Sequence, residues 1–212
     1  KKNKIKKKKY FNPRDLLFKS SNINHDSLEK LLNKSVKKQL VSDLPLASYL
    51  SSGIDSSLLS YFISNRIVDL QTFTCGFLTN SKIPKHFDES NDAYLIAKKL
   101  NVRNKSILFD QKNLDEDLKI LFEIIEEPRL GFSLPNLKIA QFIKKNNYRV
   151  VISGAGGDEM FGGYQWRYKT AFLSKNKNEF IKNFFTHNFR FNIEDLNLLF
   201  SPIKSFLKKE FN

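Results

Sequence analysis

Two short loops carry the residue types in this chain that are best suited to chemistry. Loop one, residues 50–57, reads LSSGIDSS, and loop two, residues 152–164, reads ISGAGGDEMFGGY. An apolar run precedes each loop and a helical pattern follows loop one, which is the layout that points backbone N–H groups at a phosphate. Asp55 and Asp158 add the carboxylates with which such a cradle holds Mg²⁺ against phosphate oxygens.

The small residues of the two loops suit a bound phosphate in two ways. Glycine lets the backbone approach a ligand closely or adopt a positive φ, and the glycines concerned are Gly53, Gly154, Gly156 and Gly157. Serine hydroxyls can donate to phosphate oxygens, and loop one offers Ser51, Ser52, Ser56 and Ser57. Taken alone, loop one also fits a plain helix start, with Ser as the cap and Asp in the first turn. Loop two holds five glycines around adjacent acids, which is more than a plain turn needs.

The two loops together resemble a known family. Loop one resembles the PP-motif of ATP pyrophosphatases, usually SGGxDS, and loop two resembles the second signature of asparagine synthetases, commonly SG(E/D)G(A/S/G)DE(L/V)FGGY. The pair in this order, about a hundred residues apart, is specific to the asparagine synthetase family. The resemblance runs from about Tyr10 to Tyr168 and includes VSDLPL at 41–46, TFTCGF at 72–77, and EEP at 126–128 with Pro135.

The resemblance implies an ATP-dependent amide ligation of the asparagine synthetase type. Aspartate would be activated as β-aspartyl-AMP with release of pyrophosphate, and ammonia from glutamine would then attack this acyl-adenylate. By motif position the implied ATP and pyrophosphate site comprises Leu50, Ser51, Ser52, Gly53, Ser56, Cys75, Ser153 and Gly154. Asp55 and Asp158 are the implied catalytic residues and Mg²⁺ ligands, while Glu159 would steady the loop. For Cys75, a small buried strand residue is an equal alternative to a place beside the adenosine.

Two departures from the family pattern bear on the activity. Ser52 stands where the PP-motif usually has its first Gly, and the change is small because Ser keeps a donor. Ala155 stands where the family often has Glu or Asp, a residue tied to forming the adenylate and handling the ammonia proton. Three alternatives therefore stay open: a family amidotransferase acting on another carboxylate, a PP-motif tRNA-modifying enzyme, and a nucleotide-binding fragment without ligase activity.

Composition and charge narrow the class of protein. No apolar stretch approaches the roughly 20 residues that a membrane helix needs, and no apolar segment follows the basic start as in a signal peptide. The single Cys75 excludes an internal disulfide, and three scattered His residues argue against zinc. We therefore expect a cytoplasmic protein with ATP, Mg²⁺, aspartate and ammonia or glutamine as ligands, no membrane partner, and a homodimer left open.

The net charge of +14 raises the question of nucleic acid. Much of this excess lies in the first nine residues, and a lysine run of this kind is usually a solvated tail or linker. Basic and aromatic residues do not alternate as they do in a platform for single strands. Nucleic acid is therefore not among the partners that we expect.

Strand and helix patterns predict an α/β fold with a parallel twisted sheet flanked by helices. Strands are expected at 46–50, 70–77, 105–109 and 148–152, and helices at about 26–41, 56–65, 88–100, 114–125 and 137–145. Asp26 or Ser27 is expected to cap the first helix. Both loops then lie at the carboxyl ends of strands, where ligands bind in such sheets. The resemblance implies the Rossmann-like adenine nucleotide alpha hydrolase fold, also called the PP-loop ATP pyrophosphatase fold.

The resemblance also implies a domain organisation. Residues 1–12 would be a basic linker from a missing N-terminal glutaminase domain, and residues 13–168 the ATP-pyrophosphatase-like synthetase domain. Residues 169–212 would be the start of a truncated, helical C-terminal part. We expect a fragment of a longer protein, because the chain begins with Lys and no Cys lies near its start.

Overall fold

The computed structural model of the chain describes residues 7–10, 12, 24–78, 88–110, 112–126, 133–165, 169, 172–181 and 183. These residues belong to two compact units, residues 1–153 and residues 154–212. Three features named above lie outside the described residues: the lysines at 1–6, the Glu-Pro pair at 127–128, and the predicted C-terminal part beyond residue 183.

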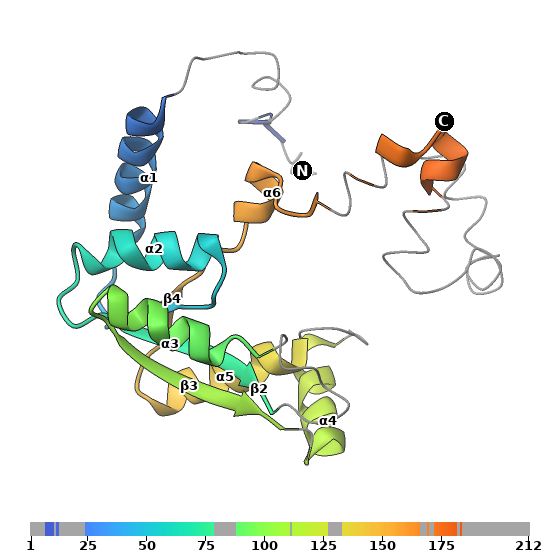
Figure 1. The fold of residues 1–212 in the computed structure, drawn as a ribbon. Coiled ribbons are helices and arrows are strands. Elements are labelled where there is room, and N and C mark those ends of the chain that lie inside the picture. The colour runs from blue at the N-terminus through green and yellow to red at the C-terminus, as the bar shows by residue number, and fades with distance from the viewer. Residues whose placement is uncertain are drawn as a thin grey trace, which may run out of the picture. The chain divides into compact units, whose positions relative to one another are not determined.

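The first unit is built around a parallel sheet. Within the described residues it has four strands in the order β3-β2-β1-β4. The strands are β1 (Leu46–Tyr49), β2 (Gln71–Phe77), β3 (Arg103–Phe109) and β4 (Val150–Ile152). Each pair of neighbouring strands is parallel, so the α/β class that the sequence predicts is confirmed (Figure 1).

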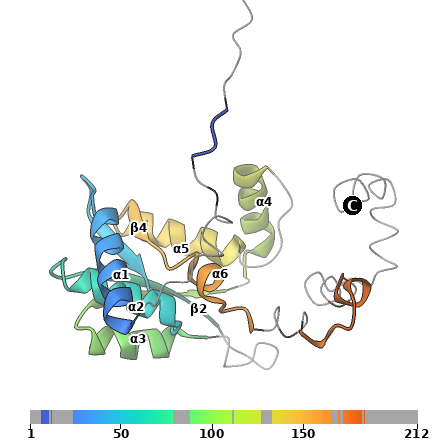
Figure 2. The same ribbon diagram turned by 90° about the horizontal axis from the view of Figure 1, so that it is seen from above.

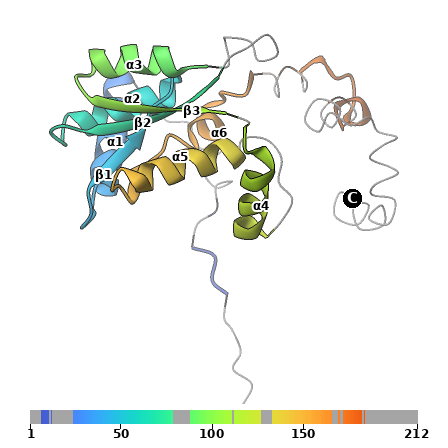
Figure 3. The ribbon, with the colours of Figure 1, turned by 90° about the horizontal axis from the view of Figure 1, so that it is seen from below.

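Helices cover both faces of this sheet. They are α1 (His25–Gln39), α2 (Ile54–Ser64), α3 (Ser90–Lys99), α4 (Leu114–Ile125) and α5 (Ser133–Lys145). Figure 3 shows α2 and α3 on one face and α5 on the other. Strands β1 to β3 are added toward one edge of the sheet, whereas β4 is added at the opposite edge, and right-handed crossovers then place the connecting helices on opposite faces. α1 packs on α2 through Val36, Phe62 and Ile63. α4 packs against α5, as Figure 2 shows from above, where the buried Leu121 and Leu134 share a cluster.

Small side chains let α2 and α3 approach the strand that leads into loop one. Ser48 of β1 and Ser60 of α2 are fully buried, and their hydroxyl oxygens lie 3.2 Å apart. Leu50, which follows β1, packs on Ala93 and Ala97 of α3. Each of these five side chains is buried, so the start of loop one is held firmly between the two helices.

The register of the sheet brings the starts of the two loops together. β1 pairs with β2 on one side and with β4 on the other, and Ser48 lies opposite Ile152. Leu50 and Ser153 therefore leave neighbouring parallel strands at the same edge. The connection after β1 leads to β2 on one side of β1, whereas the connection before β4 leads to the other side of β1. The strand order therefore reverses between β1 and β4, which makes the carboxyl ends of these two strands a topological switch point. The predicted position of both loops at the carboxyl ends of strands is confirmed.

Two details of the helices differ from the sequence-based expectation. The predicted caps of α1 were wrong: Asn24 is the N-cap, and its side-chain oxygen accepts the N–H of Ser27 at 2.9 Å. α5 begins at Ser133, earlier than predicted, and Pro135 lies in its first turn. Proline is tolerated there because the first N–H groups of a helix have no intrahelical partner. None of the described helices is long and apolar enough to cross a membrane.

Candidate functional site

Loop one is held in shape by its own serine hydroxyls. The Ser56 hydroxyl oxygen lies 2.8 Å from that of Ser51 and accepts the Ser51 N–H at 3.0 Å. The Ser51 hydroxyl in turn accepts the N–H of Gly53 at 3.1 Å. The Ser57 hydroxyl donates to the Gly53 carbonyl oxygen at 2.8 Å. These contacts occupy the N–H groups of Ser51 and Gly53 and leave the Ser52 N–H pointing out of the loop.

The Ser52 N–H is already hydrogen-bonded to a carboxylate oxygen. The Ser52 backbone donates to Oε2 of Glu89 at 2.9 Å, across 37 residues of sequence. Glu89 is the N-cap residue of α3, but its side chain does not cap that helix. The Ser52 amide is therefore oriented to bind an anion, as a phosphate cradle requires, and a carboxylate occupies that position in this structure. The sequence reasoning did not identify Glu89.

Asp88 fixes the segment that carries Glu89. Its carboxylate accepts the N–H of Phe77 at 3.2 Å, and the N–H and hydroxyl of Ser90 at 3.1 and 3.0 Å. Gly76 makes room for it, because a Cβ at that position would lie 2.5 Å from the Asp88 carboxylate. The start of α3 is thus tied to the end of β2, beside loop one.

The first turn of α2 is the second source of N–H donors. Gly53 is its N-cap and supplies no side-chain cap, so the plain capping role considered for Ser is not what the structure shows. Asp55 lies in this first turn and is half-buried. Gly53 has φ −68°, so it is not needed for a positive φ. Its role is space, because a Cβ there would lie 3.1 Å from the Ser51 hydroxyl.

The replacement of Gly by Ser at position 52 causes no backbone strain. The non-glycine residues with a positive φ, within the described part of the chain, are Asp69, Asn101, Glu126 and Asn147. Ser52 is not one of them, and its side chain is exposed. The expectation that this departure is small is consistent with the geometry of the loop.

Leu50 directly follows β1, and Cys75 lies in β2, two residues before its end; both are in mainly packed surroundings. The Leu50 side chain is 2% exposed, its N–H donates to the Phe73 carbonyl, and its carbonyl accepts the Thr74 hydroxyl. Cys75 is half-buried and packs against two apolar clusters, one of which contains Phe109. Burial raises the pKa of the Cys75 thiol, and the negative charge of Asp88 raises it further. A place for either residue beside an adenosine stays a prediction.

Most of loop two lies in the second unit, where it forms a tight turn and the short helix α6 (Gly157–Phe161). Gly156 has φ +100° and is the N-cap of α6, a conformation that favours glycine. The Gly157 N–H donates to the Gly154 carbonyl at 3.1 Å, and the exposed Ala155 lies within this turn. Of the three loop-two glycines named from the sequence, Gly156 therefore adopts the positive φ that was expected, and the close approach of Gly154 and Gly157 to a ligand stays a prediction.

The side chain of Asp158 lies in the first turn of α6, close to a glycine. A Cβ on Gly163 would lie 1.7 Å from Oδ1 of Asp158, so only glycine leaves room for the carboxylate in this position. The Tyr164 hydroxyl donates to Oε1 of Glu159 at 2.8 Å. This contact fits the expectation that Glu159 steadies the loop.

Each of the two loops carries one carboxylate of the kind that binds magnesium together with a phosphate. In the described residues, no three His, Cys, Asp or Glu side chains come together as a metal-binding group. Magnesium, however, is usually held by one or two carboxylates together with water and substrate phosphates. Asp55 lies in the first turn of α2 and Asp158 in the first turn of α6, so each loop supplies one such carboxylate.

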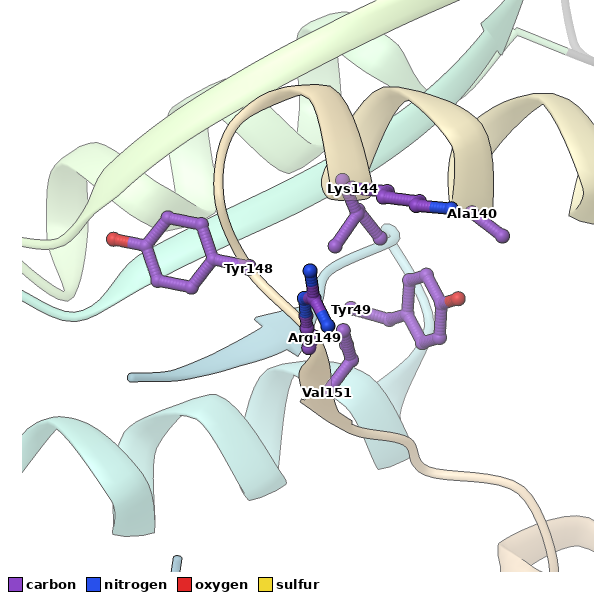
Figure 4. A pocket seen from close by; sticks show the side chains of 7 residues that line it. Tyr49, Ala140, Lys144, Tyr148, Arg149 and Val151 are labelled. Atoms are coloured by element: carbon purple, nitrogen blue, oxygen red, sulfur yellow. The ribbon is translucent and has the colours of Figure 1, made fainter. Parts of the chain in front are cut away.

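A separate cavity of about 430 Å³ lies beside β4 and does not include either loop. It is lined by Tyr49, Ala140, Ile143, Lys144, Tyr148, Arg149 and Val151. In the view of Figure 4, Tyr148 and Tyr49 stand on opposite sides, with Arg149 and Val151 between them. Burial raises the pKa of the Tyr49 hydroxyl. None of the site residues predicted from the sequence lines this cavity.

Comparisons with known proteins agree with the two loops. The chain matches the family described as asparagine synthase over residues 27–209. It is 31% identical over 177 residues to asparagine synthetase (glutamine-hydrolyzing) 2 of Bacillus subtilis, and the aligned region covers 76% of this chain and 23% of that protein. It is 29% identical over 168 residues to asparagine synthetase (glutamine-hydrolyzing) of Zea mays, which covers 73% and 27%. The chain therefore spans about a quarter of the length of these curated relatives.

Solved structures with a similar arrangement are more distant in sequence. The NH3-dependent NAD synthetase from Campylobacter jejuni matches with a TM-score of 0.43 and 18% identity, over 67% of this chain and 61% of that chain. The U34-tRNA thiolase NcsA from Methanococcus maripaludis matches with a TM-score of 0.46 and 19% identity, over 73% and 56%.

The match to the family covers most of the chain and includes both loops. With residues 27–209 matched and a parallel sheet that brings the starts of the two loops to one edge, this chain belongs to the asparagine synthase family.

Proposed function

We propose that this chain is the nucleotide-binding part of an asparagine synthetase-type ligase, in which ATP activates a carboxylate that ammonia then converts to an amide. The observation that carries the proposal is the Ser52 N–H, which donates to an anionic oxygen at the switch point of the sheet. Membership of the asparagine synthase family supports the same reaction class.

Loop one would bind the pyrophosphate part of ATP. The Ser52 N–H and the first-turn N–H groups of α2 are the donors suited to phosphate oxygens. Ser51 and Ser56 would keep the loop in the shape that presents these donors, because their hydroxyls bond its backbone. Leu50, Cys75, Ser153 and Gly154 would lie near the nucleoside, as the family motifs imply.

Asp55 and Asp158 would hold Mg²⁺ on the nucleotide. When bound, the ion would neutralise the charge that develops on the departing pyrophosphate. The chain's own part in this proposal is to supply one carboxylate from each loop, together with the N–H donors of loop one, to the charge that develops.

Aspartate is the proposed acceptor, and Ala155 bears on how well the chain can use it. Members of the family often have Glu or Asp at this position, and Ala155 supplies no group to take a proton from ammonia. We expect the 212-residue chain to bind nucleotide and to make little or no asparagine. General acid–base help is typically worth ~10²–10⁴-fold, so its loss alone would hide turnover.

Pyrophosphate release with ATP and ammonia tests this proposal, with and without aspartate. The chain would be compared with its Ala155→Glu variant and with the full-length Bacillus subtilis relative as a positive control. Aspartate-dependent release that rises in Ala155→Glu supports the proposal, and the same gain must vanish when Asp55→Asn is added. The proposal is contradicted if aspartate changes pyrophosphate release only in the control protein and the chain also fails to bind ATP.

A further inference from the structure

Glu89 places a negative charge at the position where loop one would bind phosphate. Its carboxylate is 2.9 Å from the Ser52 N–H, a distance typical of a charge-assisted hydrogen bond. Any phosphate oxygen that binds this N–H must displace the carboxylate. Even then, Glu89 stays within one side-chain length of the phosphate.

The backbone on both sides of Glu89 is hydrogen-bonded to its surroundings. Its neighbour Asp88 accepts three hydrogen bonds, from Phe77 and Ser90. The Glu89 carbonyl accepts the N–H of Ala93 at 2.9 Å as the first bond of α3. We therefore expect the Glu89 carboxylate to yield to a ligand mainly by rotation of its side chain.

Among the residues that the structure describes, Glu89 forms no ion pair with a cation. In the part of the chain that the structure describes, ion pairs join Lys112 to Asp110 and Lys138 to Asp117. Neither Glu89 nor Asp55 takes part in one of these pairs. A polyphosphate at loop one would therefore meet the carboxylates of Glu89 and Asp55, and like charges close together disfavour one another.

We propose that Glu89 makes loop one selective for polyphosphate complexed with a divalent cation, against metal-free polyphosphate. This inference rests on the proposed function, because it concerns the same phosphate site. A divalent cation bound to the phosphates lowers the repulsion between the phosphates and Glu89. It can also bind the displaced carboxylate, because such cations prefer oxygen ligands. Metal-free nucleotide has no cation to lower the repulsion or to bind the carboxylate, so Glu89 competes with it for the Ser52 N–H.

Calorimetric titration of the 212-residue chain with ATP tests this selectivity, once with excess Mg²⁺ and once with EDTA. The quantity compared is the metal-free Kd divided by the Kd with Mg²⁺. Glu89→Gln is nearly isosteric and keeps an oxygen that can accept the Ser52 N–H, so it removes the charge alone. Glu29→Gln on the exposed surface of α1 makes the same change in net charge and serves as the matched control.

The ratio is expected to fall roughly tenfold in Glu89→Gln, mostly through tighter binding of metal-free ATP, and to stay at the parent value in Glu29→Gln. Glu89→Ala should shift the ratio in the same direction. Equal ratios in the parent and both Glu89 variants would overturn the inference alone, as would weaker metal-free binding in Glu89→Gln. If the parent binds no ATP even with Mg²⁺, the proposed function and this inference are both overturned.

Discussion

The hydroxyl oxygens of Ser51 and Ser56 lie 2.8 Å apart, and this contact closes loop one over the first turn of α2. Ser56 also accepts the Ser51 N–H, so a single hydroxyl from the helix organises the segment that follows β1. The Ser52 N–H projects from the loop because its neighbours on both sides are bonded within the loop.

Ser56→Ala should loosen loop one and weaken nucleotide binding. It removes the acceptor of the Ser51 N–H, and a hydrogen bond of this kind contributes about 0.5–1.5 kcal/mol net. We expect the Kd for ATP with Mg²⁺ to rise several-fold, measured by calorimetry. Ser64→Ala is the control, because this serine bonds the Tyr61 carbonyl at the far end of the same helix. Equal affinities in both variants would mean that the loop keeps its shape without Ser56.

Gly163→Ala should displace the carboxylate of Asp158. The added Cβ would lie 1.7 Å from Oδ1, and Gly163 is not one of the described glycines that need a positive φ, so the clash is the main effect. Binding of ATP with Mg²⁺ should weaken as much as in Asp158→Asn. Met160→Ala, on the exposed side of α6, should bind normally. Parent-like binding in Gly163→Ala would show that the observed position of Asp158 is not required.

The ion pair between Asp117 and Lys138 should stabilise the packing of α4 on α5. Asp117 is 6% exposed, so Asp117→Ala leaves the partly buried Lys138 ammonium without its partner. We expect a loss of roughly 2–4 kcal/mol in the free energy of unfolding, measured with urea. The exposed pair of Asp110 and Lys112 offers the contrast, and Asp110→Asn should change stability by less than about 1 kcal/mol. Similar losses in both variants would contradict this assignment.

The thiol of Cys75 should react slowly in the folded protein. Burial, with a further contribution from Asp88, raises its pKa, so at a given pH the fold holds less thiolate than an exposed cysteine does. Alkylation with iodoacetamide at pH 8 should be slower in the folded chain than in urea, and the rates should converge as the pH rises. The signal comes from one residue, because Cys75 is the only cysteine. Equal rates at pH 8 would contradict the raised pKa, and further slowing by ATP with Mg²⁺ would support a place for Cys75 near the nucleotide.

The local features of the fold could be predicted from the sequence. β1, loop one and α2 follow one another as expected, because an apolar run, a small-residue turn and a helical pattern are each local signals. The cap of α1 was missed because Asn24, Asp26 and Ser27 are all good capping residues, and the structure selects Asn24. The early start of α5 was missed because Pro135 was not considered as a first-turn residue.

Glu89 could not be found by the same reasoning. Its contact with Ser52 joins residues that are 37 positions apart, and it depends on the parallel pairing that places α3 beside loop one. An acid just before a helix normally indicates a cap, so the local pattern points to a different role. The one available signal is general: acids that follow the carboxyl ends of parallel strands gather at one edge of the sheet.

The most direct test of the account is the affinity of the chain for ATP with Mg²⁺ in three variants. Asp55→Asn and Asp158→Asn should each weaken binding by roughly 1–3 kcal/mol, because each removes a charged ligand from the proposed magnesium site. Asp43→Asn, an exposed acid that precedes β1, should bind as the parent does. Calorimetry that shows the parent affinity in both Asp55→Asn and Asp158→Asn would contradict the proposal that these two carboxylates hold the metal of a bound nucleotide.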